Sequence, residues 1–220
     1  MRRLPKRASY DVATVHRILD AGLVCHIGYV IDGEPYVTPT AYWRDGNHLY
    51  WHGSRASRML EAVASGARVC VTVTHLDGLV AARSGFHHSI NYRSVMLFGR
   101  PRRIDDPDAK HAALDAFIER LYSARVSEIR PPTPKELKAT TVVAMTIDEA
   151  SAKMRSGPPL DDDEDYALPV WAGVIPVETR FGTPIADARL PRNTPLPGYR
   201  ARLIGNGLGT PRAAGRRRRG

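Results

Sequence analysis

The residues best placed to do chemistry lie in the stretch HGSRASR at residues 52–58, where a strand-like run meets a helix-like one. The start of a helix exposes unpaired backbone N–H groups and the positive end of the helix dipole, and both favour a bound anion. Ser54 and Ser57 add hydroxyl donors, and the guanidinium of Arg55 or Arg58 can bind a phosphate through two N–H groups. The stretch predicts a site for a phosphate monoester. A serine-capped helix with solvated arginines fits the same residues equally well.

A second polar stretch, HHSINYRSV at residues 87–95, begins a long strand-like run. Adjacent histidines point to opposite sides of an extended chain, and no third ligand follows at metal-site spacing, so zinc chemistry is disfavoured. The chain also lacks a Gly-x-Ser-x-Gly elbow, which argues against acyl transfer. Tyr92 and Ser94 would share one face of the strand and Arg93 the other. That pattern suits a polar ligand and, equally, an ordinary outward-facing strand.

A third stretch, PYVTPTAY at residues 35–42, has a proline inside a strand-like run. Pro39 removes one backbone donor, which indicates an edge strand or a bulge. Such a backbone can offer free N–H and C=O groups to a planar heterocycle. The simpler interpretation is an edge strand guarded by its proline.

The elements that must position these stretches are mostly strands. Asp-Gly turns between the runs 23–31, 35–43 and 48–52 predict a three-stranded antiparallel meander. Further strands are predicted at 68–75, 79–84, 91–104 and 141–148, the last with a possible extension through residue 153. Helices are predicted at 10–21, 54–65 and 108–122, and another begins at the Thr-Pro-Lys-Glu of residues 133–136. The pattern predicts an α+β fold, mostly β, built as one antiparallel barrel with peripheral helices.

Composition bounds the class of protein. The chain has 220 residues, 43% of them hydrophobic and 25% charged, as in an ordinary soluble domain. A basic N-terminus without an apolar run, and two cysteines within strand-like runs, predict a cytoplasmic protein with free thiols. The net charge of +9 falls to +4 (9 − 5) without the five arginines of the last nine residues. We therefore expect a flexible segment at 1–8, one domain at 9–190, and a largely disordered tail at 191–220 that binds nucleic acid at most non-specifically.

Taken together, the three stretches resemble the pyridoxamine 5′-phosphate oxidase-like flavin-binding family, in the branch that includes the nitroimidazole-resistance proteins. The quoted motifs occur in the family's order, and WAGVIP at residues 171–176 extends the match, which covers roughly residues 8–190. The resemblance implies a six-stranded split β-barrel that forms a homodimer, with two FMN sites at the dimer interface. The spacing of the histidines predicts no metal site.

The resemblance also assigns roles by position. It implies that the flavin ring lies against the backbone of Val37, Thr38, Thr40 and Ala41. It places the flavin phosphate on His52, Ser54, Ser57 and Arg58, with His52 also able to shuttle a proton as the catalytic residue. It puts Asn91, Tyr92, Arg93 and Ser94 at the flavin, partly from the partner subunit, and makes Trp171 a cover contributed by that partner.

The implied activity is an FMN-dependent oxidoreductase that reduces a small acceptor such as a nitro-aromatic compound or a quinone. The chain lacks the C-terminal segment that binds substrate phosphate in true pyridoxamine 5′-phosphate oxidases, so oxidation of vitamin B6 is not expected. Three alternatives stay open: a reductase using the deazaflavin F420, a haem-binding split barrel with His52, His87 or His88 as ligand, and a non-catalytic flavin-binding or regulatory module.

Overall fold

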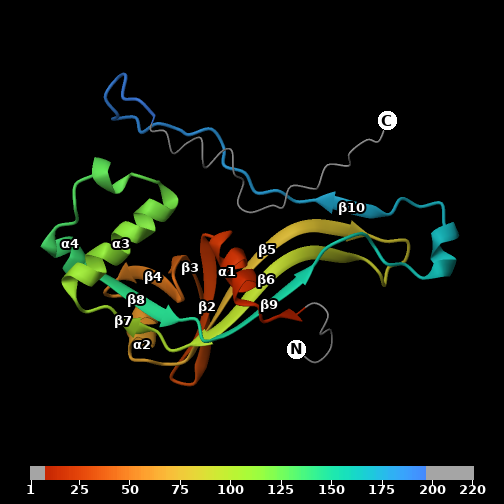
Figure 1. Ribbon diagram of the computed structural model, residues 1–220, viewed down its shortest axis with the longest axis horizontal. Helices are drawn as coiled ribbons and strands as arrows, with labels where there is room; N and C mark the ends of the chain where they lie inside the picture. Colours follow the sequence, from red (N-terminus) through yellow and green to blue (C-terminus); the bar gives the residue numbers. More distant parts are fainter. Residues whose placement is uncertain (1–7, 197–220) are drawn as a thin grey trace. The chain divides into compact units, whose positions relative to one another are not determined.

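The computed structural model describes residues 8–196, which form a mostly antiparallel sheet with a few helices (Figure 1). The predicted fold class is confirmed, but the sheet has ten strands rather than six. The strands are β1 Ala8–Ser9, β2 Val24–Ile31, β3 Glu34–Asp45, β4 His48–Ser54, β5 Val69–Ala81, β6 Ser89–Gly99, β7 Arg102–Arg103, β8 Thr140–Thr146, β9 Glu149–Arg155 and β10 Gly173–Pro176. The helices are α1 Val12–Asp20, α2 Arg58–Ala64, α3 Pro107–Leu121 and α4 Pro134–Ala139, with 3₁₀ turns η2 at Val126–Glu128 and η3 at Asp163–Ala167.

The sheet order is β1-β9-β6-β5-β2-β3-β4-β8-β7, and β10 pairs with β5 off this path. The predicted meander is confirmed, because β2 pairs with β3 and β3 with β4, both antiparallel. Two structural units divide the described chain. The larger consists of residues 8–76 and 92–156, and the smaller of residues 77–91 and 157–196.

Three predicted strand boundaries were wrong for identifiable reasons. The strands predicted at 68–75 and 79–84 are one strand, β5, because the Asp-Gly pair at residues 77–78 forms no turn between them and Gly78 pairs with Pro176 of β10. Pro101 separates β6 from the short β7, where a single strand was expected. The strand predicted at 141–148 is β8, but its predicted extension through residue 153 is a separate strand, because β8 pairs with β4 and β9 pairs with β6.

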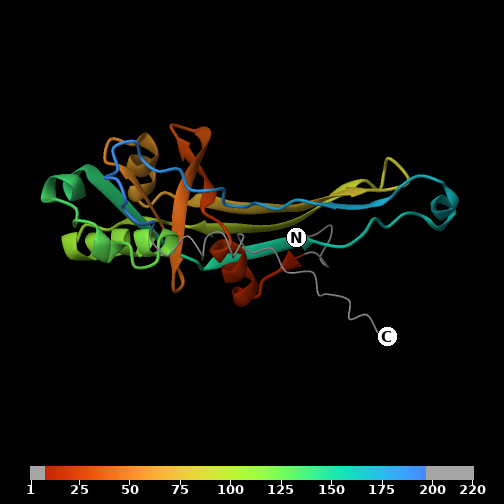
Figure 2. The same cartoon turned by 90° about the horizontal axis from the view of Figure 1, so that it is seen from above.

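The helices begin where side chains cap their free N–H groups. Asp11 caps α1, because its carboxylate accepts a hydrogen bond from Thr14 N at 2.8 Å. Thr133 and Glu136 form the predicted capping box at the start of α4. In the larger unit, α3 lies beside β8 and next to α4 (Figures 1 and 2).

The core of the larger unit is apolar and closely packed. Leu60 and Val63 of α2 are buried, together with the Trp51 side chain of β4 and Ile18 of α1. Both cysteines are free, with Cys25 buried in this core. Within residues 8–196, every helix is too short or too polar to cross a lipid bilayer. The predicted flexible N-terminus and arginine-rich tail lie largely outside the described residues.

Candidate functional site

The strand β3 leaves part of one edge open, as its internal proline predicts. Its ladder with β2 covers Glu34–Ala41, whereas its ladder with β4 covers only Tyr42–Asp45. Within the described residues, β3 is therefore paired along one edge only from Glu34 to Ala41. Backbone N–H and C=O groups on the other edge are free to bond a ligand.

The predicted ring-contacting residues alternate between the two faces of β3. Thr38 and Thr40 pair with Ile27 and Cys25, which belong to the buried core, so their side chains lie on the core side. Val37 and Ala41 lie on the opposite, outer face. A ring held at the open edge would therefore contact backbone more than side chains, as the family resemblance implies.

The predicted phosphate-binding residues lie at the junction of β4 and α2. Ser57 caps α2, with its Oγ accepting a hydrogen bond from Leu60 N at 3.4 Å, and Ser54 Oγ accepts one from Ala56 N at 3.2 Å. Both hydroxyls keep their own hydrogen for an incoming acceptor. The Arg58 guanidinium lies over the Tyr36 ring at 5.6 Å from its centroid. Since α2 has only seven residues, anion binding here depends on these side chains more than on a helix dipole.

The His52 side chain lies on the face of β4 that meets α3. Its ring meets the Phe117 ring edge-on at 4.9 Å between centroids, and the Trp43 ring at 5.8 Å. Its Nδ1 is buried with no hydrogen-bond partner among the described residues. Burial lowers the pKa of His52 by desolvating the charged form. At neutral pH the ring is therefore a neutral imidazole.

His52 forms part of the wall of a cavity of about 670 Å³ beneath α3. Leu114, Phe117 and Ile118 of α3 supply apolar wall, and His111 adds a second imidazole. The apolar face of α3 does not enter the buried core, because no residue of α3 is fully buried. The face instead lines this cavity, which suits a large apolar group with one or two nitrogen ligands.

The remaining predicted residues lie on other elements. Tyr92, Arg93 and Ser94 are in β6, and the sheet order puts β5, β2 and β3 between β6 and β4. Ser94 Oγ donates to Lys153 O at 3.2 Å. Within one chain, residues 92–94 of β6 and the phosphate-binding residues that follow β4 therefore do not lie on neighbouring strands.

Asn91 and Trp171 belong to the smaller unit. The Asn91 side chain is buried, and its Nδ2 donates to Gly157 O at 3.1 Å. Trp171 is 66% exposed. No group of three or more metal-binding side chains occurs in the part of the chain that the structure describes.

The buried imidazole gives a pH-dependence prediction. An unfolded histidine titrates near pH 6.5, whereas folded His52 resists protonation until a lower pH. As the pH falls below about 6.5, the unfolded chain takes up a proton that the folded chain refuses, so the free energy of unfolding decreases. We expect His52→Gln to remove this component. Calorimetric unfolding of cofactor-free protein between about pH 8 and pH 5 should show the wild type losing stability relative to the variant only below about 6.5.

The control for that measurement is His48→Gln, at the exposed start of the same strand. If the free energy of unfolding of the wild type followed the same pH dependence as that of His52→Gln over the whole range, the burial of His52 would have no effect on stability.

Comparison with known proteins places this geometry in context. Residues 11–154 match the family model described as pyridoxamine 5′-phosphate oxidase. A search of curated protein sequences gave no match.

Two solved structures match nearly the whole chain. A flavocytochrome from Azotobacter vinelandii is 44% identical, with 92% of this chain and 94% of that chain covered and a TM-score of 0.88. An FAD- and haem-binding protein from Mycobacterium smegmatis is 39% identical, with 93% and 100% covered and a TM-score of 0.88. A protein from Bacteroides thetaiotaomicron, described as a 5-nitroimidazole antibiotic resistance protein, shares the fold at 20% identity, with 66% and 85% covered and a TM-score of 0.57.

Proposed function

Because the chain belongs to the pyridoxamine 5′-phosphate oxidase family, we propose that it is a redox protein that binds a flavin together with a haem. The observation that carries this proposal is the match, at 44% and 39% identity over more than nine tenths of the chain, to two proteins named for these groups. Bound flavin would supply two-electron chemistry and bound haem one-electron chemistry. The protein would position the two groups so that electrons pass from one to the other.

The residues of β3 and the β4–α2 junction fit a flavin. The open edge of β3 offers backbone groups to a ring system, and Arg58, with no acidic partner in the described chain, offers a positive charge to a phosphate. The sequence predicted FMN. We favour FAD, because the Mycobacterium smegmatis relative is named for it.

The cavity beneath α3 fits a haem. Haem requires apolar walls and an axial ligand, most often a neutral imidazole, and His52 supplies an imidazole that partial burial keeps neutral. Its Nδ1 is enclosed by protein, so Nε2 is the nitrogen left for a metal. His87 and His88 fit poorly. His87 pairs with Asp162 at 3.3 Å, and His88 Nδ1 bonds Ser84 O at 2.9 Å.

This proposal changes the role expected of His52. An imidazole that holds iron through Nε2 cannot also shuttle a proton through that atom. The Phe117 and Trp43 rings would then fix the plane of His52 and keep water from it. Reduction of a nitro-aromatic compound or quinone stays a prediction from the sequence.

We also propose that the working form is a homodimer. Val24 and Val30 of β2 and Val37 of β3 are 53%, 57% and 68% exposed, and the register puts all three on the outer face of the sheet. A contiguous apolar face of this kind marks an interaction surface, and a second copy could bring its own β6 stretch to the flavin. Light scattering after size exclusion should give twice the chain mass of 24.3 kDa. Val37→Lys should shift the mass toward one chain, and a monomeric wild type would refute the proposal.

The test of the function uses the purified full-length chain. Its absorbance spectrum should show flavin bands and a haem Soret band, and haem added to protein that lacks it should produce that band at one equivalent per chain. Chromatography of the released flavin then separates FAD from FMN, and titration of flavin-free protein compares both with F420. Protein that binds flavin but never haem would return the assignment to the simple flavoprotein predicted from sequence. Protein that binds neither would overturn the proposal.

A further inference from the structure

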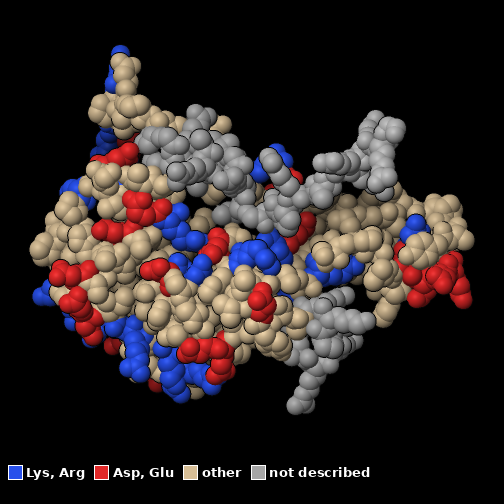
Figure 3. Space-filling view, in the orientation of Figure 1, with Lys and Arg blue, Asp and Glu red and all other residues tan. Residues whose placement is uncertain are grey.

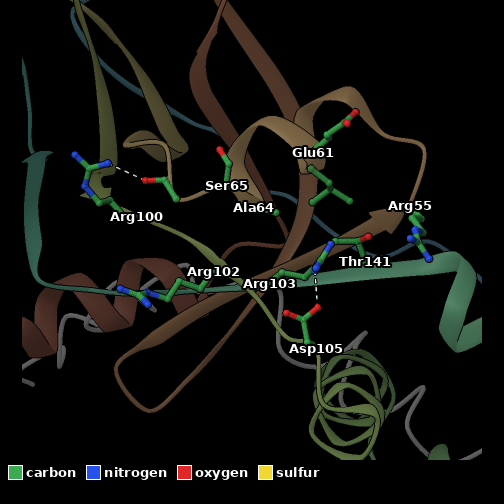
Figure 4. Close-up of a pocket in the computed structure, with 11 residues that line it drawn as sticks. Arg55, Glu61, Ala64, Ser65, Arg100, Arg102, Arg103, Asp105 and Thr141 are labelled. Carbon is green, nitrogen blue, oxygen red and sulfur yellow. Dashed lines mark hydrogen bonds and ion pairs between the residues drawn. The ribbon is translucent and has the colours of Figure 1, made fainter.

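Positive charge gathers on the larger unit near α2 and β7. Figure 3 shows lysine and arginine side chains along its lower edge, where Figure 1 draws these two elements. A cavity of about 850 Å³ opens there, and four of the side chains lining it are arginines (Figure 4). These are Arg55, Arg100, Arg102 and Arg103.

The charges in this cavity are poorly compensated. Arg103 Nε pairs with Asp105 Oδ1 at 2.6 Å, and Arg100 Nη1 donates to the carbonyl oxygen of Gly66 at 2.8 Å. The guanidinium groups of Arg55 and Arg102 have no hydrogen bond or ion pair with another residue of 8–196. Glu61 is the second acidic side chain in the lining, so four guanidinium groups face two carboxylates, an excess of +2 (4 − 2).

The backbone that carries these arginines is fixed by the fold. Arg102 and Arg103 form β7 and pair with Ala144 and Val143 of β8. Arg55 N donates to Ala139 O at 2.9 Å, which holds the turn before α2. The arginines are therefore presented from an ordered frame, which lowers the entropy lost when they bind a ligand.

The cavity is separate from the sites proposed above. None of the residues that the resemblance assigns to the flavin lines it, and it shares no residue with the cavity beneath α3. Arg55, which the sequence offered beside Arg58 for a phosphate, lines this cavity instead. It lies beside a smaller hollow that includes Arg68 and shares Arg100 and Arg102 with it. Its charge therefore requires an explanation of its own.

We propose that this cavity binds a small anion with two adjacent phosphates, of the nucleoside diphosphate class. Figure 4 shows Arg55 on one side of the cavity and Arg100 and Arg102 on the other. A diphosphate carries more negative charge than a single phosphate and presents it in two directions, so it can pair bidentately with the guanidinium groups of more than one arginine. A hollow of this volume is also the size of a small-molecule site, which favours a nucleotide over the flat surface of an acidic protein.

The experiment titrates the flavin-loaded full-length protein calorimetrically with pyrophosphate, ADP, phosphate and AMP. Pyrophosphate and ADP should bind one per chain and more tightly than phosphate and AMP, with affinity falling as salt is added. ADP binding tighter than pyrophosphate would show that the nucleoside is recognised as well. No binding of either diphosphate at millimolar concentration would overturn the proposal.

A double variant, R55S/R102S, locates the site. Losing two charged donors should weaken pyrophosphate binding by at least about tenfold, with flavin content unchanged. The matched control is Arg189→Ser, whose side chain is 95% exposed and lies outside the cavity. Binding by the five C-terminal arginines would persist in the double variant and would refute the proposal. The wild type could instead bind neither diphosphate but be retained on heparin, with that retention lost in R55S/R102S. That result would overturn the proposal and assign the surface to a macromolecular polyanion.

Discussion

Replacing His52 with alanine should abolish tight haem binding while leaving flavin binding intact. The imidazole is half-buried against Phe117 and Trp43, and burial keeps it neutral and ready to coordinate. Removing a group that merely supports a metal ligand typically costs about 10- to 100-fold in affinity, so loss of the ligand itself should cost more. Titration with haem, followed at the Soret band, measures the effect.

Two controls separate coordination from collapse of the cavity. Added imidazole should enter the space left by His52→Ala and restore the Soret band, because the apolar walls on α3 remain. His87→Ala and His88→Ala should bind haem as the wild type does. If His52→Ala kept a normal Soret band and His111→Ala lost it, the haem ligand would be His111, which lines the same cavity.

Replacing Arg58 with alanine should weaken flavin binding by about 10- to 100-fold, the usual effect of losing a hydrogen bond to a charged group. The guanidinium rests on the Tyr36 ring, near the open edge of β3, and has no acidic partner in the described structure. Fluorescence titration of flavin-free protein with FAD and with FMN measures the loss.

The matched control for that experiment is Arg55→Ala, three positions earlier. Its guanidinium lines the arginine-rich cavity, so flavin affinity should stay at the wild-type value. Arg58→Lys should fall between wild type and alanine, because lysine keeps the charge but loses the bidentate geometry. Equal flavin affinity in wild type and Arg58→Ala would remove this residue from the site.

Much of the fold could be predicted because local signals agreed with the tertiary structure. The Asp-Gly turns of the meander and the capping box of α4 are decided by residues close in sequence. The signal at residues 77–78 failed because a strand about a hundred residues later pairs there. A Cβ on Gly78 would lie 3.1 Å from Ile175 O, so this glycine permits close approach rather than a turn.

The candidate site was predictable in its pieces but not in its arrangement. Pro39 correctly indicated a strand with an open edge. Alternation in β4 could have shown that His52 shares a face with Tyr50 rather than with the buried Trp51. Its contact with Phe117 could not be foreseen, because the apolar spacing of α3 reads the same for a helix over the core and for one over a cavity.

The shallow attachment of α3 has a consequence for how a ligand reaches the cavity beneath it. Elements with few buried contacts open at the lowest free energy, well below that of global unfolding. Since α3 contributes no fully buried side chain, we expect it to open at a lower free energy than the apolar centre around Trp51. Opening would have to break the hydrogen bonds from Arg120 Nη2 to the carbonyl oxygens of Leu19, Asp20 and Gly22. A bulky prosthetic group could enter when α3 opens locally, and once bound it would stabilise the closed helix. Amide hydrogen exchange in α3 would then slow as the cavity fills.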